Sequence, residues 1–413
     1  MAEPTKWRTA LIGCGWWGKN ILKEAIAAGR SKIVGLCDVD ETVLEVAADQ
    51  TGELSGDQPK LYKDYRELLE KEKPQIVIIA TPDHWHALVT IAALKAGAHV
   101  YVEKPTSHTI AESCAMLRAA RDSGRVVQVG LHRRVGPHYV SALRFLRSGA
   151  VGKIGMVRLF AHSGGGAEQP TLNGPPPDGL DWNFYCGPAP LRPFCRRIHP
   201  GGWRQFLDFA NGQLGDWGVH WLDQVLAWTE ETYPRRVFST GGRPIRGAPV
   251  LNEKEQTTDA PDSQVAIYEF ESFTCVWEHR QFAENNAEKH RIGAYFHGTQ
   301  GTLHIGWRDG WTFYPVKAKE PTIHHNAELQ EPDGHNLQLH WADFLNAIAT
   351  GRKPAADIES SHRASVMALL GMLSWKLGRS VKWDGEREQC VGDAEANRLL
   401  RREYRAPWKY PHA

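Results

Sequence analysis

The sequence has little charge imbalance, no long apolar run and no paired cysteine motif. Its 413 residues contain 49 Lys and Arg against 48 Asp and Glu, so the formal net charge is only +1. This balance argues against nucleic acid or a membrane surface as the main partner. No stretch is long and apolar enough to span a bilayer, and the polar residues 1–6 contain no signal-peptide core. We therefore expect a cytoplasmic protein.

The cysteines and histidines give no sign of a disulfide framework or a metal site. Seven cysteines are scattered without a CxxC pair, which is typical of reduced thiols in a cytoplasmic protein. The imidazoles of His324, His325 and His335 make metal binding conceivable. No set of carboxylates and histidines has ligand spacing, however, so we predict no metal site.

A glycine-rich turn near the N-terminus organises the first part of the chain. Residues 7–12 are predicted as a strand and residues 21–28 as a helix, and Gly13, Gly15 and Gly18 lie between them. In a dinucleotide-binding turn the first glycine makes the turn, the second admits the pyrophosphate and the third lets helix and strand pack closely. A glycine-rich turn in another doubly wound protein is the alternative.

The second predicted strand, residues 32–37, ends in Asp38. A carboxylate at this position suits the ribose hydroxyls of NAD and would repel the 2′-phosphate of NADP. The alternative is a solvated turn residue. Together with the glycine spacing, Asp38 favours NAD as the cofactor.

Two folding patterns divide the chain near residue 130. Strands and helices alternate before it, which indicates an α/β doubly wound parallel sheet, a Rossmann domain over residues 1–130. Residues 131–413 are predicted as an α+β domain with a large, mostly antiparallel open sheet for substrate binding and oligomerisation. Residues 164–200 are rich in Gly and Pro and show no periodicity, and a loop of that length is often functional.

Two short motifs carry the candidate chemistry. Lys104 follows Glu103 at a predicted strand end, where it can donate to a substrate hydroxyl, although a surface lysine is equally compatible with the position. Asp216 and His220 are four residues apart in a predicted helix over residues 214–229, so they can touch. A carboxylate would fix the tautomer of the imidazole and raise its basicity, as a general base requires. The alternative is a structural Asp–His pair.

In combination, the motifs GCGWWG, CDVD, ATPDHWH, VEKP and GDWGVHWLD resemble the Gfo/Idh/MocA family of oxidoreductases over nearly the whole chain. The resemblance implies a Rossmann domain followed by an α/β domain whose open sheet forms dimer or tetramer contacts. It also implies oxidation or reduction of sugars, cyclitols and related polyols with NAD(P). Where the common family pattern reads VGFNRR, this chain has VGLHRR, which places His132 in the position of the asparagine.

The resemblance and the residue patterns together give a set of candidate site residues. The predicted catalytic residues are Lys104, Asp216 and His220, with His220 as general base. The predicted cofactor-binding residues surround the glycine turn and the following strand ends: Gly13, Gly15, Trp17, Gly18, Asp38, Thr81, Pro82, His84, His86, Glu103 and Lys104. The predicted substrate residues are mostly aromatic side chains that could stack on a sugar ring: His132, Trp182, Tyr185, Trp203, Arg204 and Trp217. Alternatively, the aromatic residues anchor the long loop to the core.

These observations predict an NAD-dependent dehydrogenase that acts on a hydroxyl carbon of a sugar, glycoside or polyol, with C3 of a pyranose as the first choice. An alternative keeps the cofactor in a redox-neutral cycle of glycoside cleavage or epimerisation. A non-catalytic sugar or nucleotide sensor on the same fold is the second alternative. We expect a small-molecule carbohydrate as partner, no nucleic acid or membrane partner, and a homo-oligomer, either a dimer or a tetramer.

Overall fold

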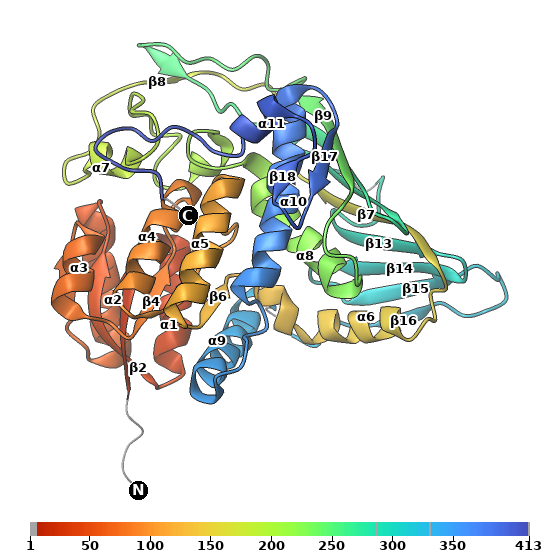
Figure 1. The fold of residues 1–413 in the computed structure, drawn as a ribbon, viewed down its shortest axis with the longest axis horizontal. Coiled ribbons are helices and arrows are strands. Elements are labelled where there is room, and N and C mark those ends of the chain that lie inside the picture. Colours follow the sequence, from red (N-terminus) through yellow and green to blue (C-terminus); the bar gives the residue numbers. More distant parts are fainter. Residues whose placement is uncertain (1–5, 286, 330–331, 412–413) are drawn as a thin grey trace, which may run out of the picture.

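The computed structural model describes residues 6–285, 287–329 and 332–411, which form two sheets with helices packed against each (Figure 1). The first sheet is parallel, with strand order β3-β2-β1-β4-β5-β6. Its elements are β1 (Trp7–Ile12), α1 (Trp16–Ala27), β2 (Ser31–Cys37), α2 (Glu41–Ser55), β3 (Lys60–Tyr62), α3 (Tyr65–Glu72), β4 (Ile76–Ile79), α4 (Asp83–Lys95), β5 (His99–Val102), α5 (Ile110–Ser123) and β6 (Val127–Val129).

Both faces of this sheet are buried, which explains the nearly continuous apolar strands. Along β1, Leu11 contributes to the core beneath α1 and α2, whereas Ala10 and Ile12 contribute to the core beneath α3, α4 and α5. Side chains of a strand alternate between the two faces, so an apolar residue is needed at every position. The predicted doubly wound Rossmann fold is confirmed.

The second sheet has ten strands in the order β16-β15-β14-β13-β7-β12-β11-β9-β17-β18, and only the β7–β12 pair is parallel among the strands described. This confirms the predicted mostly antiparallel sheet. The remaining elements are η1 (His132–Val135), α6 (Pro137–Arg147), β7 (Ile154–His162), β8 (Thr171–Leu172), α7 (Trp182–Cys186), η2 (Gly202–Gln205), η3 (Leu214–Gly218), α8 (Val219–Trp228), β9 (Arg236–Gly242), β10 (Glu255–Gln256), β11 (Ser263–Glu269), β12 (Thr274–Arg280), β13 (Ile292–Gly298), β14 (Gly301–Gly306), β15 (Trp311–Pro315), β16 (Ile323–His325), α9 (Pro332–Thr350), α10 (Ile358–Leu377), β17 (Val381–Asp384), β18 (Gln389–Cys390) and α11 (Ala394–Arg398).

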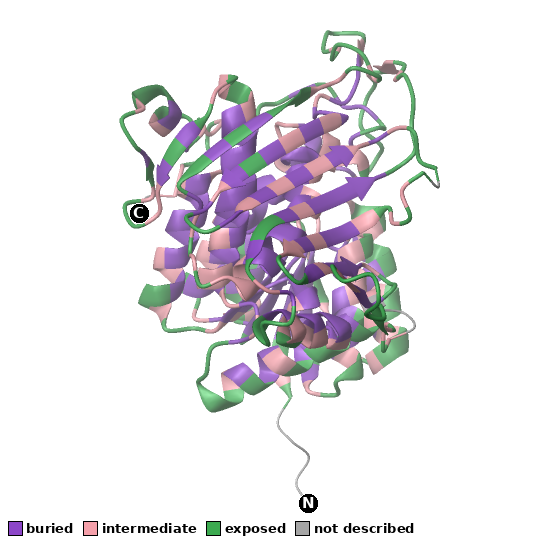
Figure 2. Ribbon diagram, turned by 90° about the vertical axis from the view of Figure 1, so that its right-hand side faces the viewer, coloured by how far each residue is buried: buried purple, intermediate pink, exposed green. Residues whose placement is uncertain are grey.

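Helices cover only one of the two faces of the ten-stranded sheet. Helices α6, α8 and α10 pack against this sheet, and α10 also contacts α5 of the Rossmann domain (Figure 1). The other face is open, and Figure 2 shows buried residues alternating mostly with partly buried ones along its strands, and with exposed ones along β9. Large apolar side chains are among the exposed ones, including Met156, Phe238 and Ile267. Phe238 and Ile267 are directly paired across β9 and β11.

The sequence missed several short elements. The strands β3 and β15–β18 lie where no strand was expected, and α7 interrupts the stretch 164–200 that was expected to lack regular structure. Helix α2 continues to Ser55 and is followed by Gly56, whose φ of +75° is left-handed. Strands of two to five residues are too short to show periodicity, so their pairing depends on neighbouring strands.

The end of the chain returns to the Rossmann domain. Trp341 and Phe344 of α9 are buried in the same core as residues of α1 and α2. The C-terminal tail then runs beside α4 and α5 (Figure 1), where Arg402 forms an ion pair with the buried Glu112 and donates to the carbonyl of His84. The Rossmann core is thus completed by segments more than 200 residues further along the chain.

Across the described part of the chain, none of the helices combines the length and the apolar character needed to cross a membrane.

Because α9 seals the Rossmann core, replacing its buried tryptophan should destabilise the whole fold. We expect Trp341→Ala to lower the free energy of unfolding by about 3–5 kcal/mol, since it leaves a large cavity beneath the parallel sheet. Urea denaturation followed by circular dichroism would measure the loss. Leu339 on the same helix is 42% exposed, so Leu339→Ala is the matched control and should change stability by only about 0.5 kcal/mol. Equal effects of the two substitutions would contradict this role of α9.

Candidate functional site

Each glycine of the first turn has a distinct environment. Gly13 has a φ of +93°, and a Cβ there would lie 2.6 Å from the backbone carbon of Ala80. A Cβ at Gly18 would lie 2.1 Å from the carbonyl oxygen of Gly13, so only glycine lets α1 approach the turn. A Cβ at Gly15 would meet no atom within 4 Å. The space in front of Gly15 is therefore open to a ligand, at the N-terminus of α1 where anions bind favourably.

Asp38 lies at the end of β2 beside this turn. Its carboxylate accepts hydrogen bonds from the backbone N–H of Cys14 at 2.7 Å and of Asp40 at 3.1 Å. Burial raises the pKa of Asp38, and these two hydrogen bonds act in the opposite direction. The two N–H groups fix the orientation of the carboxylate, and its remaining lone pairs face the groove next to Gly13 and Gly15.

Two adjoining cavities run along the carboxyl ends of the parallel strands. The first, of about 110 Å³, contains Gly13, Gly15, Asp38, Pro82 and Tyr185 in its wall. The second is larger, about 630 Å³. Thr81 and Trp203 line both cavities, so they mark the point where the two meet. A ligand that extends from Asp38 past the glycine turn would reach the larger cavity at this point.

The larger cavity brings together residues from both domains. Its wall includes the predicted residues Trp17, Thr81, His86, Glu103, Lys104, His132, Trp203, Arg204, Asp216, Trp217 and His220. It also includes residues that the sequence did not indicate: Trp16, Ala80, Asp83, Lys289, His290, Arg291, Ile292, Trp307, Arg308, Asp309 and Asp333. Most of this second group lie on or beside β13, β14 and α9, which are far from the motifs in sequence.

An ion pair between the two domains lies at the centre of the cavity wall. The ammonium group of Lys104 donates to the carboxylate of Asp216 at 2.5 Å and to its backbone carbonyl at 3.0 Å. The guanidinium of Arg204 lies 3.6 Å from the same carboxylate oxygen. Burial favours protonation of Asp216, but the charges of Lys104 and Arg204 prevail and hold its pKa below the usual value. The carboxylate is therefore ionised at neutral pH and keeps Lys104 in place.

The expected contact between Asp216 and His220 is not formed. Asp216 lies in the π-helical turn η3 and binds Lys104, and no hydrogen bond joins it to His220 in the described part of the chain. A π-helical turn is wider than an α-helical one, so residues four apart no longer stack on one face. Nδ1 of His220 is buried without a hydrogen-bond partner among the described residues. Burial, and then the charge of Lys104, lower the pKa of His220 well below 6.5, which is the opposite of the expected direction.

Behind the lysine, Glu103 is fully enclosed by the Rossmann fold. A Cβ at Gly130 would lie 2.3 Å from its carboxylate oxygen, so this glycine makes room for the side chain. Burial raises the pKa of Glu103 to about 7. His86 is held between the carbonyl oxygens of Pro105 and Thr81, at 2.8 and 2.9 Å, and burial lowers its pKa to about 4. These contacts fix the turn that carries Lys104.

Three of the predicted residues line neither cavity: Gly18, which packs against the turn at Gly13, and His84 and Trp182. His84 is buried with its Nε2 2.9 Å from the carbonyl oxygen of Tyr185, and burial lowers its pKa to about 3. Trp182 is 8% exposed and donates from Nε1 to the carbonyl of Arg192. The contact of His84 ties the long loop to helix α4, as in the anchoring alternative, whereas the contact of Trp182 joins two parts of the loop itself. Tyr185 is consistent with both interpretations: its ring stacks on Trp182 within the loop, and it also lines the smaller cavity.

The far wall of the cavity consists of aromatic rings around His220. His132 and Trp307 lie with their ring centres 5.5 and 5.4 Å from that of His220, and Trp217 packs against Trp307. Arg133 lies 3.4 Å above the ring of Trp307 and forms an ion pair with Asp333 at 2.5 Å. Trp307 and Asp333 could not be identified from the sequence, because their positions in the cavity wall depend on strand and helix packing.

Comparison with known proteins assigns both domains. The profile of the oxidoreductase family with an NAD-binding Rossmann fold, GFO_IDH_MocA, matches residues 7–131. The profile of the C-terminal alpha/beta domain of the same oxidoreductase family matches residues 159–239 and 283–410. Together, these matches cover most of the chain.

Among curated proteins, levoglucosan dehydrogenase from Pseudarthrobacter phenanthrenivorans is 25% identical over 278 residues, which are 63% of this chain and 64% of that protein. Inositol 2-dehydrogenase from Salmonella paratyphi B is 30% identical over 152 residues, which are 36% of this chain and 44% of that protein. The chain therefore matches less than two thirds of the length of these relatives. Among solved structures, an oxidoreductase domain protein from Kribbella flavida has a TM-score of 0.71 and 23% identity, over 94% of this chain and all of the other. This last likeness concerns the fold.

The open space at Gly15 gives a test of the dinucleotide groove. The residue has a φ of −60°, so Gly15→Ala should fold normally, yet its methyl group would occupy the space that a pyrophosphate needs. We expect the affinity for NAD to fall roughly tenfold or more, a loss of about 1.4 kcal/mol, with an unchanged melting temperature. Isothermal titration calorimetry would measure binding. Gly174, which also has open space around its Cβ position, supplies the control Gly174→Ala, and unchanged NAD affinity in Gly15→Ala would exclude this groove.

Proposed function

We propose, from the premise that the chain belongs to the Gfo/Idh/MocA family of oxidoreductases, that it transfers a hydride between a sugar or polyol hydroxyl carbon and NAD. The observation that best supports this proposal is that Lys104 and His220 line one cavity, which adjoins the NAD-binding groove at Thr81. A nicotinamide ring that continues from this groove would enter the cavity beside both side chains. The hydride acceptor would then face the substrate carbon, and the proton acceptor would face the hydroxyl oxygen bonded to that carbon.

In this proposal His220 accepts the hydroxyl proton during oxidation. Its low pKa keeps the imidazole neutral at physiological pH, so a lone pair is available to a substrate hydroxyl. The ammonium of Lys104 donates to the same oxygen and stabilises the negative charge that develops on it. Asp216 acts by holding Lys104 rather than by contacting His220. NAD supplies the hydride acceptor, and the protein residues bind, orient and exchange the proton.

The walls of the cavity favour a neutral carbohydrate. Its central charges are paired within the protein, as Lys104 and Arg204 with Asp216, and Arg308 with Asp333. Aromatic faces of the tryptophans in the wall suit the C–H faces of a sugar ring. The names of the two curated relatives, a levoglucosan and an inositol dehydrogenase, support the same substrate class. A pyranose oxidised at C3 remains our first choice of substrate and carbon.

The first experiment mixes purified protein and NAD with a panel of sugars, glycosides and cyclitols and follows nicotinamide absorbance. We expect reduction with one or a few substrates, and a decrease in kcat of about 10²–10⁴-fold in His220→Ala with unchanged NAD affinity. His297→Ala, which alters a histidine outside the cavity wall, is the control.

No net reduction but new sugar products by chromatography would identify the redox-neutral alternative. Sugar binding without any reaction would identify a sensor.

The low pKa of His220 also predicts the pH profile. A general base works only when unprotonated, so activity is present above its pKa and is lost as pH falls through it. We therefore expect the acid limb of kcat/KM to lie below pH 6.5. Glu103, with a pKa of about 7, also titrates near neutral pH, so the profile should be recorded in Glu103→Gln as well. An acid limb that stays above pH 6.5 in Glu103→Gln would argue against a neutral His220.

We further propose that the protein is a cytoplasmic homo-oligomer assembled through the open face of the ten-stranded sheet. The paired side chains of Phe238 and Ile267, 39% and 38% exposed, form an apolar centre on this face. Burying such a pair between two copies would remove it from water. Light scattering should give a dimer or tetramer for the native protein and a smaller species for Ile267→Glu. Leu339→Glu, on helix α9, is the control and should keep the native mass.

A further inference from the structure

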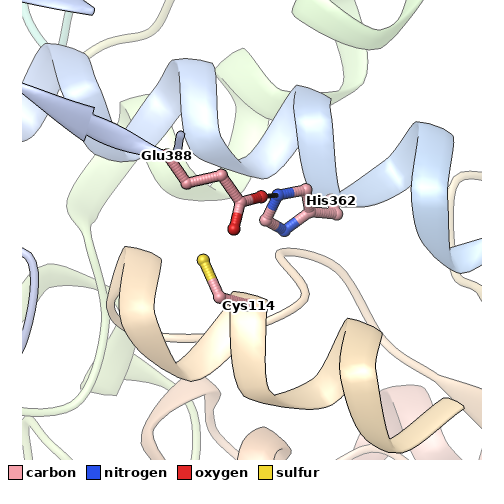
Figure 3. Close-up of side chains that lie close together, drawn as sticks. All are labelled: Cys114, His362 and Glu388. Atoms are coloured by element: carbon pink, nitrogen blue, oxygen red, sulfur yellow. Dashed lines mark hydrogen bonds and ion pairs between the residues drawn. The ribbon is translucent and has the colours of Figure 1, made fainter. Parts of the chain in front are cut away.

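A cysteine, a histidine and a glutamate from three distant parts of the chain meet outside the cavity (Figure 3). Cys114 lies on α5, His362 on α10 and Glu388 in the turn between β17 and β18. The potential ligand atoms of the three side chains all lie within 4.8 Å of one another. Figure 3 shows the thiol pointing toward the carboxylate, with the imidazole beside it. None of these residues contributes to the proposed reaction.

The three donors form a typical ligand set for zinc. A thiolate, an imidazole and a carboxylate bind Zn²⁺ at about 2.0–2.3 Å in tetrahedral geometry. Ligand atoms of one ion are therefore roughly 3–4 Å apart, and small side-chain shifts would bring the three donors here, which lie within 4.8 Å of one another, to that spacing. Nε2 of His362 is 2.6 Å from the carboxylate of Glu388, so a bound ion would replace this direct contact. The side chain of Glu388 is 24% exposed, which leaves access for the ion and for a water as fourth ligand.

The charges of the site balance those of a divalent ion. Beside the imidazole of His362, the site supplies one carboxylate, from Glu388, and one thiol, from Cys114. A bound Zn²⁺ would release the thiol proton to solvent and form a neutral unit with the thiolate and the carboxylate. A metal site without net charge has the lowest desolvation cost when it is buried.

The surroundings of His362 provide the support that a metal-binding histidine needs. Its Nδ1 lies 2.8 Å from the hydroxyl of Ser113, which lies 2.7 Å from the hydroxyl of Thr106. When Nε2 binds an ion, the ring proton resides on Nδ1 and is donated to Ser113, which fixes the orientation of the ring. Thr106 is two residues beyond Lys104. The hydrogen-bonded chain thus connects this site to the turn that carries the proposed catalytic lysine.

A second cluster of possible ligands, around His162, is less suited to a cation. Around His162, the carboxylates of Glu278 and Glu288 already bind the guanidinium groups of Arg158 and Arg280. These two cations would repel a metal ion and already neutralise its carboxylate ligands. In contrast, the cluster of Cys114 contains a sulfur donor, which favours zinc-like ions over Mg²⁺ and Ca²⁺.

We propose that Cys114, His362 and Glu388 bind a divalent transition-metal ion, best matched by Zn²⁺, that fastens the β17–β18 turn to helices α5 and α10. The proposal is independent of the dehydrogenase activity, because it concerns residues outside the cavity. The sequence could not indicate this site, since its ligands are separated by 248 and 26 positions.

The test titrates metal-depleted full-length protein with Co²⁺, whose bond to a thiolate gives a near-ultraviolet charge-transfer absorption. We expect this band in the native protein, its disappearance on adding one equivalent of Zn²⁺, and its absence in Cys114→Ser. Cys390, a buried cysteine two residues beyond Glu388, supplies the control Cys390→Ser, which should keep the band. No band in the native protein, or a band that persists in Cys114→Ser, would overturn the proposal.

A second variant keeps the test informative if Cys114→Ser fails to fold. Ser113→Ala retains all three ligands but removes the acceptor for Nδ1 of His362, so the affinity for Co²⁺ should fall about 10–100-fold while the band itself remains. Zn²⁺ should also raise the melting temperature of the native protein, and by less in Ser113→Ala at the same Zn²⁺ concentration. Equal Co²⁺ affinities in the native protein and Ser113→Ala would refute the assigned geometry.

Discussion

The partly buried ion pair between Lys104 and Asp216 is the interaction on which the candidate site depends. It joins the turn after β5 of the Rossmann domain to the π-helical turn η3 of the second domain. Truncating Asp216 would leave the ammonium group of Lys104 without this partner in a largely enclosed position, which is more costly than losing a surface pair. The pair therefore aligns the two domains and simultaneously places an ammonium group in the cavity wall. Structural and chemical roles coincide in one contact.

The electrostatics of the cavity follow from this pair. The positive charge of Lys104 holds Asp216 ionised and, together with burial, holds His220 neutral. The pKa values of a carboxylate and an imidazole are thus both lowered by the same neighbour. An ammonium donor next to a neutral imidazole is an arrangement that can exchange a proton with a hydroxyl and stabilise the resulting oxygen charge.

Chain segments that are distant in sequence complete both the core and the cavity. Helix α9 seals the Rossmann core through Trp341, and Asp333 at the start of the same helix forms an ion pair at the cavity rim with Arg133. The folding of the Rossmann sheet and the completion of the cavity are therefore linked through one helix. The proposed metal site, with ligands on α5, α10 and the β17–β18 turn, would add a third connection between early and late parts of the chain.

The sequence by itself determined the Rossmann fold, the dinucleotide turn and the mostly antiparallel second sheet. Glycine spacing and apolar strands are local signals, and the conformations of Gly13 and Gly18 follow directly from them. Only the tertiary structure decided the partner of Asp216, because the π-helical turn breaks the spacing rule that pairs it with His220. It also decided that Trp182 packs within the long loop and that Trp307 lines the cavity. Such roles depend on which elements pack together, and contacts between distant segments leave no periodic trace in the sequence.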